Sequence, residues 1–224
     1  MIKELKKRIF TSSLLIIVAI TCITINKLVF IFSILAVSLL CFIEWNIINK
    51  NYFLFKKKKK NKYIYVQLFG AAFLFIFILS ALNLYAENGK FFFIFILFIC
   101  ACSDIGGYIF GKIIGGKKLI KISPNKTISG SFGSFVFSLI PILLINLTDH
   151  VFINFKLTAY NILICLFISL ICQLGDLAIS YFKRINKVKD TGNILPGHGG
   201  LLDRIDGIIF AIPTVYFLQI IQTL

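Results

Sequence analysis

The chain contains few charged residues and almost no histidine. Only 15% of its 224 residues are Asp, Glu, Lys or Arg, 58% are hydrophobic and the mean hydropathy is +0.93, a balance that excludes an ordinary soluble domain. The two histidines, His150 and His198, are far apart in the sequence, and none of the six cysteines has C-x-x-C spacing. A zinc site is therefore not expected, and the cysteines are interpreted as small residues of the apolar segments.

Long apolar runs separate the polar parts of the chain. Several approach or exceed the length of about 18 residues that crosses a bilayer as a helix, and backbone groups in lipid must find their hydrogen bonds within the helix. No cleavable signal is evident, because the basic N-terminus precedes a long run without a small-residue cleavage motif. We therefore predict an all-α, polytopic integral membrane protein with about seven transmembrane helices (range 6–9). The runs cover about residues 10–25, 28–47, 63–85, 91–111, 131–148, 157–179 and 207–223.

The positions of the cations predict the orientation in the membrane. With the N-terminus in the cytoplasm, the four inner segments hold 4, 7, 5 and 5 Lys or Arg residues, and the outer connections hold only Lys27, Lys90 and Lys156. This asymmetry follows the positive-inside rule and predicts a cytoplasmic N-terminus and an outer C-terminus. The net charge of +15 is then explained by loops beside anionic lipids, so no nucleic-acid partner is expected. The inner segments are residues 3–8, 50–62, 112–126 and 183–204.

Two parts with different roles are expected. Residues 1–90 are predicted to form about three N-terminal transmembrane helices. Residues 91–224 are predicted to form a catalytic transmembrane domain with cytoplasmic loops at 112–129 and 180–206.

Two features of the N-terminal part have ordinary interpretations. Glu44 and Trp45 come near the end of the second run and are interpreted as an interfacial pair, with the carboxylate reaching toward water. The lysines at 56–60 are interpreted as a solvated loop near anionic headgroups.

The longest polar interval runs from Ser180 to Asp206 and reads S-Y-F-K-R-I-N-K-V-K-D-T-G-N-I-L-P-G-H-G-G-L-L-D-R-I-D. Burying this interval in lipid would cost too much, so it lies at the membrane surface. Glycines let a backbone approach a phosphate closely, and lysine and arginine supply charge for binding it. The composition therefore predicts a site that handles phosphate and metal. The cations are Lys183, Arg184, Lys187, Lys189 and Arg204, and the glycines are Gly192, Gly197, Gly199 and Gly200.

Three aspartates are candidate magnesium ligands. Asp203 and Asp206 are three residues apart and share one face if the final helix begins near them. Asp176 ends the preceding apolar run, and we expect it to meet them where the two helix ends converge. Carboxylates with few other ligands suit Mg²⁺, which keeps positions open for substrate phosphates.

Asp104 lies inside the fourth apolar run, within the segment S-D-I-G-G-Y-I-F-G-K. It is about 10 Å from the end of a helix, where a lone carboxylate costs about 3 kcal/mol on insertion scales. Such an acid normally faces a cavity or a partner, so we expect it to position Lys126 or a cation. Gly107 and Gly111, four residues apart, permit close helix packing.

The basic connection after this run contains S-P-N-K-T-I-S-G. Ser123, Lys126 and Thr127 there offer hydroxyl and ammonium donors beside a helix start, which would form a ledge for phosphate. The alternative is a lysine-rich loop with a capping residue.

The interval from Ser180 to Asp206 resembles, without a gap, the signature of CDP-diacylglycerol synthases (phosphatidate cytidylyltransferases), S-x-apolar-K-R-x4-K-D-x-G-x2-L-P-x-H-G-G-apolar-x-D-R-apolar-D. The S-D-I-G-G-Y segment is similar to the family's D-x-x-A-Y, and S-P-N-K-T-I-S-G to its S-P-x-K-T-x-E-G. The resemblance covers about residues 100–207. There are departures: Gly107 replaces a common alanine, Ser129 replaces a common glutamate, and the chain is short for the family, which implies fewer N-terminal spans.

The resemblance implies cytidylyl transfer from CTP to phosphatidate, giving CDP-diacylglycerol and pyrophosphate in bacterial phospholipid biosynthesis. The site would lie on the cytoplasmic side of the inner or plasma membrane. The resemblance also implies Mg²⁺, a second cation for which K⁺ is a candidate, and a homodimer. The expected catalytic residues are Asp176, Asp203, Lys183 and Arg184; the phosphate contacts are Ser123, Lys126, Thr127, Lys189, His198 and Arg204; the metal ligands are Asp176, Asp203 and Asp206; Asp104 and Asp190 are further candidates.

Two other functions remain open from the residues. A CDP-alcohol phosphotransferase also uses membrane aspartates and magnesium, but its pattern D-G-x2-A-R-x8-G-x3-D-x3-D does not continue here, since Asp206-Gly207 is followed by I-I-F-A. A channel or lipid transporter would use Asp104 to line a pathway, and this leaves the polar interval unexplained. CTP-dependent release of pyrophosphate distinguishes the enzyme from the transporter.

Overall fold

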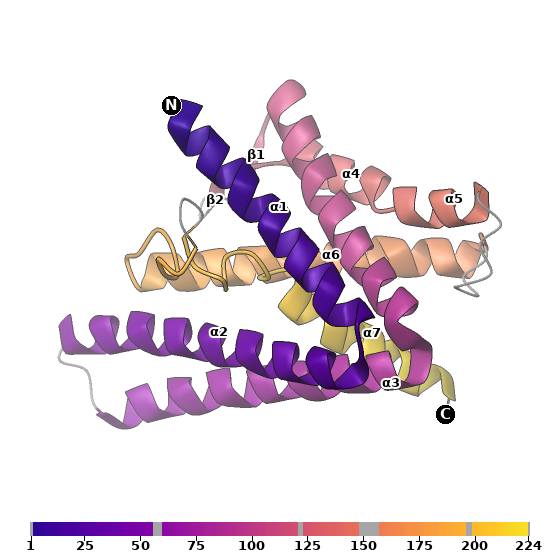
Figure 1. The fold of residues 1–224 in the computed structure, drawn as a ribbon. Helices are drawn as coiled ribbons and strands as arrows, with labels where there is room; N and C mark the ends of the chain where they lie inside the picture. The colour runs from indigo at the N-terminus through magenta and orange to yellow at the C-terminus, as the bar shows by residue number, and fades with distance from the viewer. Residues whose placement is uncertain (1, 56–59, 121–122, 148–156, 196–198, 224) are drawn as a thin grey trace. The chain divides into compact units, whose positions relative to one another are not determined.

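The computed structural model describes residues 2–55, 60–120, 123–147, 157–195 and 199–223. It is mostly α-helical, which confirms the all-α class, and it adds a short two-stranded antiparallel sheet that the sequence did not predict (Figure 1). The helices are α1 (Ile2–Thr24), α2 (Lys27–Phe55), α3 (Lys60–Ile113), α4 (Ile128–Phe137), α5 (Ile140–Leu147), α6 (Ala159–Ile185) and α7 (Ile208–Thr223), and the strands are β1 (Lys118–Ile120) and β2 (Ser123–Thr127).

The described helices identify an integral membrane protein. Four helical stretches are long and apolar enough to cross a membrane, one of them formed by α4 and α5 together, and two shorter helices are also apolar. The stretch in α3 has 53 residues, about 80 Å of helix, which is more than twice the thickness of a bilayer core. Gly89 interrupts α3 with a φ of 80°, between the predicted apolar runs 63–85 and 91–111. The four stretches are Lys27–Lys50, Asn61–Ile113, Ile128–Leu147 and Ala159–Ile185.

One predicted helix boundary near the polar interval is wrong, and the condition set for a shared face of Asp203 and Asp206 is not met. The sixth apolar run was expected to end near residue 179, but α6 continues to Ile185, so Asp176 lies within this helix and not at its end. The final helix begins at Ile208, so Asp203 and Asp206 do not share a helical face. The α6 boundary was missed because apolar content marks the part of a helix that suits lipid, while a helix can continue into water on polar residues. The final helix does not continue in this way, and residues 201–207 form turns and bends before it.

The chain divides into two compact units. The first unit consists of residues 1–82 and 182–205, and the second of residues 83–181 and 206–224. These units group residues by contact, and they do not test the predicted division at residue 90, which is a division by function. Their practical consequence is that Asp203 belongs to the first unit while Asp176 and Asp206 belong to the second.

In the first unit, α2 packs beside the beginning of α3 (Figure 1). Trp45 of α2 donates a hydrogen bond from its indole Nε1 to the carbonyl oxygen of Val66, at 3.2 Å. Gly70 lies against the same indole, and a Cβ atom there would overlap the ring. At the other end of α2, Asn26 caps the helix by accepting a hydrogen bond from the backbone N–H of Val29 at 2.8 Å.

In the second unit, small residues bring α3, α4 and α6 close together. The predicted close packing around Gly107 is confirmed, since a Cβ atom there would lie 2.6 Å from Ser134 Oγ of α4. The hydroxyls of Ser103 in α3 and Ser169 in α6 are buried and 2.8 Å apart. Each hydroxyl therefore finds its partner on a neighbouring helix, as buried polar groups require.

Candidate active site

The polar interval begins inside α6 and continues as a loop between α6 and α7. Lys187, with a φ of 56°, follows the end of α6. Farther along, Leu195 and Gly199 form an isolated antiparallel bridge, and Gly199 has a φ of 84° that glycine adopts without strain. His198 and Gly197, two members of the predicted phosphate loop, lie outside the described residues.

Asp203 is held by donors on both of its oxygens. Lys183 Nζ donates to Oδ1 at 2.7 Å, while Oδ2 accepts from the backbone N–H groups of Thr191 at 2.8 Å and Gly200 at 3.3 Å. The Asp203 side chain is only 7% exposed. Burial alone would raise the pKa of Asp203, but the hydrogen bonds from Lys183 and Thr191 outweigh it, and the pKa lies below its ordinary value.

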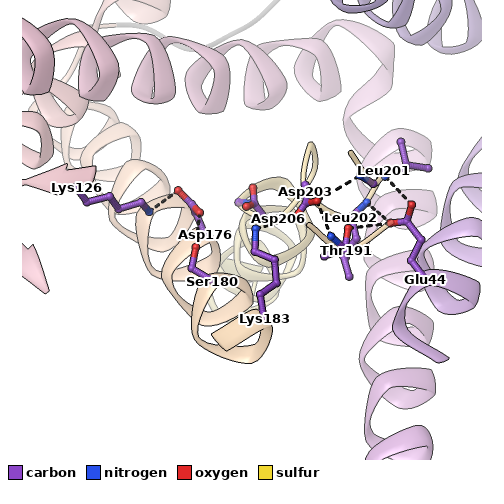
Figure 2. A network of polar contacts seen from close by, with 12 residues as sticks. Glu44, Lys126, Asp176, Ser180, Lys183, Thr191, Leu201, Leu202, Asp203 and Asp206 are labelled. Atoms are coloured by element: carbon purple, nitrogen blue, oxygen red, sulfur yellow. Dashed lines mark hydrogen bonds and ion pairs between the residues drawn. The ribbon is translucent and has the colours of Figure 1, made fainter. Parts of the chain in front are cut away.

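Glu44 of α2 is buried against the same loop, with 1% of its surface exposed. Its Oε1 accepts from the N–H of Leu201 at 2.9 Å; its Oε2 accepts from the N–H of Leu202 at 2.9 Å and from the hydroxyl of Thr191 at 3.1 Å (Figure 2). The interpretation of Glu44 as an interfacial carboxylate is therefore wrong. Three donors of the loop replace the water that a carboxylate otherwise requires.

Two glycines of the interval make room for Glu44. A Cβ atom on Gly192 would lie 2.5 Å from Glu44 Oε1, and one on Gly200 would lie 2.6 Å from Glu44 Oε2. The sequence predicted that these glycines let the backbone approach a phosphate. The structure gives both of them a protein carboxylate as neighbour. We call Glu44, Lys183, Thr191 and Asp203, with the loop amides that bind them, the Asp203 network.

A second group of acids lies in the second unit. Lys126 of β2 forms a salt bridge with Asp176 of α6, and Ser180 Oγ donates to Asp176 Oδ1 at 3.3 Å (Figure 2). The side chains of Lys126 and Asp176 are 25% and 32% exposed, so this pair is more accessible than Lys183 and Asp203. We call Asp104, Lys126, Asp176, Ser180 and Asp206 the Asp176 cluster.

Asp206 approaches Asp176 because the chain carries glycines where the segments meet. A Cβ atom on Gly175 of α6 would lie 2.7 Å from the carbonyl oxygen of Asp206, and one on Gly207 would overlap Cys172 Sγ. Burial raises the pKa of Asp206 well above its ordinary value, and repulsion from Asp176 and then Asp104 raises it further. A hydrogen bond between the carboxyl groups of Asp206 and Asp176 acts in the same direction.

Asp104 lies near the other charged groups of this cluster, and its predicted role of positioning Lys126 or a cation stays a prediction. It interacts electrostatically with Asp176 and Lys126, and its Oδ1 lies 3.8 Å from Cys172 Sγ. Its partners thus come from α6 and β2, as intramembrane acids generally require.

The predicted phosphate ledge has a structural role that can be read directly. Thr127 caps α4, since its Oγ1 accepts from the N–H of Gly130 at 3.0 Å. Its hydroxyl also lies 3.0 Å from that of Ser129, which in turn bonds to the carbonyl oxygen of Gly115. Ser129, where the resembling family commonly has glutamate, therefore links the start of α4 to the connection that follows α3. Ser123 lies in β2, paired with Ile120.

The remaining candidates lie on the surface of the first unit. The exposed side chains are Arg184, Lys189, Asp190 and Arg204. Two residues were missed, Glu44 and Thr191. Thr191 stood inside the polar interval, and Glu44 carried the same signal as Asp104, a carboxylate within an apolar run.

The Asp176 cluster fits a divalent cation better than the Asp203 network does. Within the described parts of the chain, no group of three or more His, Cys, Asp or Glu side chains is arranged to hold a metal ion. Asp176 and Asp206 nevertheless form a close pair of carboxyl groups, and Mg²⁺ commonly takes one or two protein carboxylates and completes its shell with water and phosphate oxygens. Asp203 already accepts three hydrogen bonds, so its role as a metal ligand stays a prediction.

Comparisons with known proteins agree with the resemblance of the motifs. The chain matches the model of the cytidylyltransferase family over residues 47–221. It is 47% identical over 117 residues to a protein of Bacillus subtilis (strain 168) named phosphatidate cytidylyltransferase, covering 52% of this chain and 42% of that protein. Proteins of the same name from Staphylococcus saprophyticus and Staphylococcus aureus (strain COL) are 41% and 43% identical over 136 residues, which are 60% of this chain and 51% of each. The chain thus spans about half the length of the curated relatives it matches.

Proposed function

The chain belongs to the cytidylyltransferase family, and from this membership we propose that it transfers a cytidylyl group from CTP to phosphatidate. The products are CDP-diacylglycerol and pyrophosphate. The names of the curated relatives support this substrate pair.

The observation that carries the proposal is the pairing of aspartates with lysines in the matched segment. Lys126 pairs with Asp176, and Lys183 pairs with Asp203. A carboxylate fixes the position of the lysine ammonium group that it binds. The ammonium group then has two further N–H donors for a phosphate.

The reaction needs little proton transfer from the protein. A phosphate monoester has its second pKa near 6, so the phosphatidate phosphate is largely dianionic at neutral pH. One of its oxygens attacks the α-phosphorus of CTP, the bond from that phosphorus to the bridging oxygen of the β-phosphate breaks, and pyrophosphate departs with the electron pair. The obstacle is the repulsion between two anions, and cationic side chains beside the phosphates reduce it.

Asp176 and Asp206 would hold Mg²⁺, which when bound neutralises charge on the triphosphate and on the leaving pyrophosphate. Lys126, paired with Asp176 and partly exposed, would contact a phosphate oxygen, and Lys183 would do the same beside Asp203. Arg184, Lys189 and Arg204 are exposed and would contact the triphosphate or the lipid phosphate. A second cation such as K⁺ and a homodimer are also part of the proposal.

The proposed orientation has seven spans, a cytoplasmic N-terminus and the site on the cytoplasmic side. The length of Asn61–Ile113 supports two crossings there, separated at Gly89. The concentration of 21 of the 24 Lys and Arg residues in alternate connections supports the orientation. CTP and magnesium are both available on the cytoplasmic side.

The test is release of pyrophosphate by purified protein in detergent micelles that contain phosphatidate, with CTP and Mg²⁺ supplied. We expect pyrophosphate and CDP-diacylglycerol in equal amounts, and neither product when phosphatidate or CTP is omitted. Formation of a phosphodiester lipid from CDP-diacylglycerol and an alcohol, without use of CTP, would instead identify a CDP-alcohol phosphotransferase. Lipid transport without pyrophosphate release would favour the transporter.

A further inference from the structure

Helix α2 contributes a carboxylate that no comparison assigns to the site. The match to the cytidylyltransferase family begins at residue 47, three residues after Glu44. The sequence places Glu44 in an apolar stretch, Lys27–Lys50, that has the properties of a membrane span. Its carboxylate is nevertheless turned into the polar loop (Figure 2). A carboxylate is costly to bury, so its position requires a reason beyond anchoring.

The contacts of Glu44 connect directly to Asp203. Thr191 donates its hydroxyl to Glu44 and its backbone N–H to Asp203. Leu202, whose N–H binds Glu44 Oε2, is the residue immediately before Asp203. Glu44 therefore fixes the chain on two sides of Asp203, once through Thr191 and once through the adjoining peptide.

Trp45, the next residue of α2, fixes the position of Lys183, which is the partner of Asp203. The Trp45 ring stacks on Phe182, with ring centroids 3.9 Å apart and an angle of 6° between the planes. Phe182 immediately precedes Lys183, the lysine that binds Asp203 Oδ1. Trp45 is itself held by its hydrogen bond to Val66. Two consecutive residues of α2 thus hold both members of the Lys183–Asp203 pair.

We infer that Glu44 is a positioning residue for cytidylyl transfer, acting through Thr191 and Leu202 on Asp203, with Trp45 acting through Phe182 on Lys183. This inference rests on the proposed function. Glu44 touches no reacting atom, and its effect comes from holding the Lys183–Asp203 pair in one arrangement. Small displacements of groups that act at a reacting centre reduce rates strongly.

Glu44→Gln tests the inference with almost no change in volume. The carboxamide replaces one acceptor oxygen by an NH₂ donor, and both oxygens of Glu44 face N–H groups, so either orientation sets donor against donor. We expect kcat for pyrophosphate release to fall about 10- to 100-fold while KM for CTP stays unchanged. Glu87→Gln is the matched control, since Glu87 accepts a hydrogen bond from Gln219 in the second unit and is exposed. We expect wild-type kcat for this control.

Thr191 provides a second pair of variants that removes less of the contact. Thr191→Val deletes the hydroxyl donated to Glu44 and keeps the backbone N–H that binds Asp203, whereas Thr191→Ser keeps both. We expect Thr191→Ser to retain more activity than Thr191→Val. In the double variant of Glu44→Gln with Thr191→Val, the losses should combine to less than their product, because both act on one contact.

Hydrogen exchange separates this inference from the proposed function. The amides of Leu201 and Leu202 should exchange faster in Glu44→Gln than in the wild type, and at the wild-type rate in Glu87→Gln. Unchanged exchange, or a wild-type kcat per folded molecule of Glu44→Gln, overturns the positioning role. If the wild-type protein releases no pyrophosphate, the proposed function falls, and the exchange result alone decides whether Glu44 holds the loop.

Discussion

The Asp203 network and the Asp176 cluster use the same residue types in opposite ways. In the Asp203 network, each carboxylate is surrounded by donors: Asp203 accepts from Lys183 and two backbone amides, and Glu44 accepts from three groups of the loop. In the Asp176 cluster, carboxyl groups face one another, and Lys126 is the cation paired with Asp176. The pKa of Asp203 is accordingly lowered, while that of Asp206 is raised.

The two groups of residues are therefore suited to different tasks. A network whose charges are balanced by its own donors keeps a loop in place and orients a lysine. A cluster with more carboxylates than cations attracts a divalent cation. The predictions below test this difference.

The largest effect is expected for removal of a proposed metal ligand, Asp176, from the Asp176 cluster. Asp176→Asn keeps the shape of the side chain but removes its negative charge and one of the two oxygens that could bind a cation. Turnover should therefore fall about 10²–10³-fold or more. The protein should still purify as a folded species. The measurement is pyrophosphate release at saturating CTP and Mg²⁺, with Glu87→Gln as the control. If Asp176→Asn retained most of the activity, the Asp176 cluster would not take part in the reaction.

For the free energy of unfolding, the larger loss is expected in the Asp203 network and not in the Asp176 cluster. Asp203→Asn removes the charge from an acceptor of three hydrogen bonds and leaves Lys183 without its carboxylate, so the free energy of unfolding should fall by about 2–3 kcal/mol. Asp206→Asn relieves repulsion with Asp176 and should leave stability unchanged or higher. Both can be measured by thermal unfolding in detergent. Equal losses in the two variants would mean that the two groups of carboxylates do not differ.

The glycines offer a smaller and purely steric comparison. Gly200→Ala places a Cβ atom 2.6 Å from Glu44 Oε2, which should cost about 1–3 kcal/mol through overpacking of the Asp203 network. Gly111→Ala in α3 brings its Cβ atom only to 3.2 Å from Thr127 Oγ1 and gains helix propensity, so the two effects should nearly cancel. Unfolding midpoints of the two variants provide the test. A larger loss for Gly111→Ala would contradict the packing described for the loop.

The smallest effect is a difference in pH dependence. The raised pKa of Asp206 makes the folded state less stable as the pH rises above about 3.9, the unfolded value, and through the folded pKa. Asp206→Asn should therefore gain stability relative to the wild type as the pH rises. The lowered pKa of Asp203 stabilises the folded state above about 3.9, and this contribution is lost as the pH falls through the folded pKa. The deficit of Asp203→Asn should thus shrink in acid, which unfolding midpoints at several pH values would show.

Prediction from sequence succeeded where the type of a residue alone indicates whether its surroundings are apolar or polar. Apolar runs predicted the helices, and Asp104 predicted a polar neighbourhood inside a helix, which Lys126 and Asp176 supply. It failed where the environment depends on a distant segment. Glu44 looked like an interfacial carboxylate because its donors, Leu201 and Leu202, come more than 150 residues later.

The loop glycines illustrate the same limit at a smaller scale. Gly192 and Gly200 indicated that another group approaches the backbone closely, but the sequence did not identify that group. A phosphate was the natural expectation beside five cations, but the neighbour is the carboxylate of Glu44. A glycine signals missing volume, and only the fold identifies the atoms that fill it.

The contact between Glu44 and the loop means that the N-terminal helices are not interchangeable membrane anchors. A chimaera in which an unrelated apolar helix replaces α2 would satisfy the bilayer equally well and would still insert. It would leave the amides of Leu201 and Leu202 and the hydroxyl of Thr191 without their acceptor. Transfer of residues 180–206 into another protein therefore also requires a glutamate at the position that Glu44 occupies in α2.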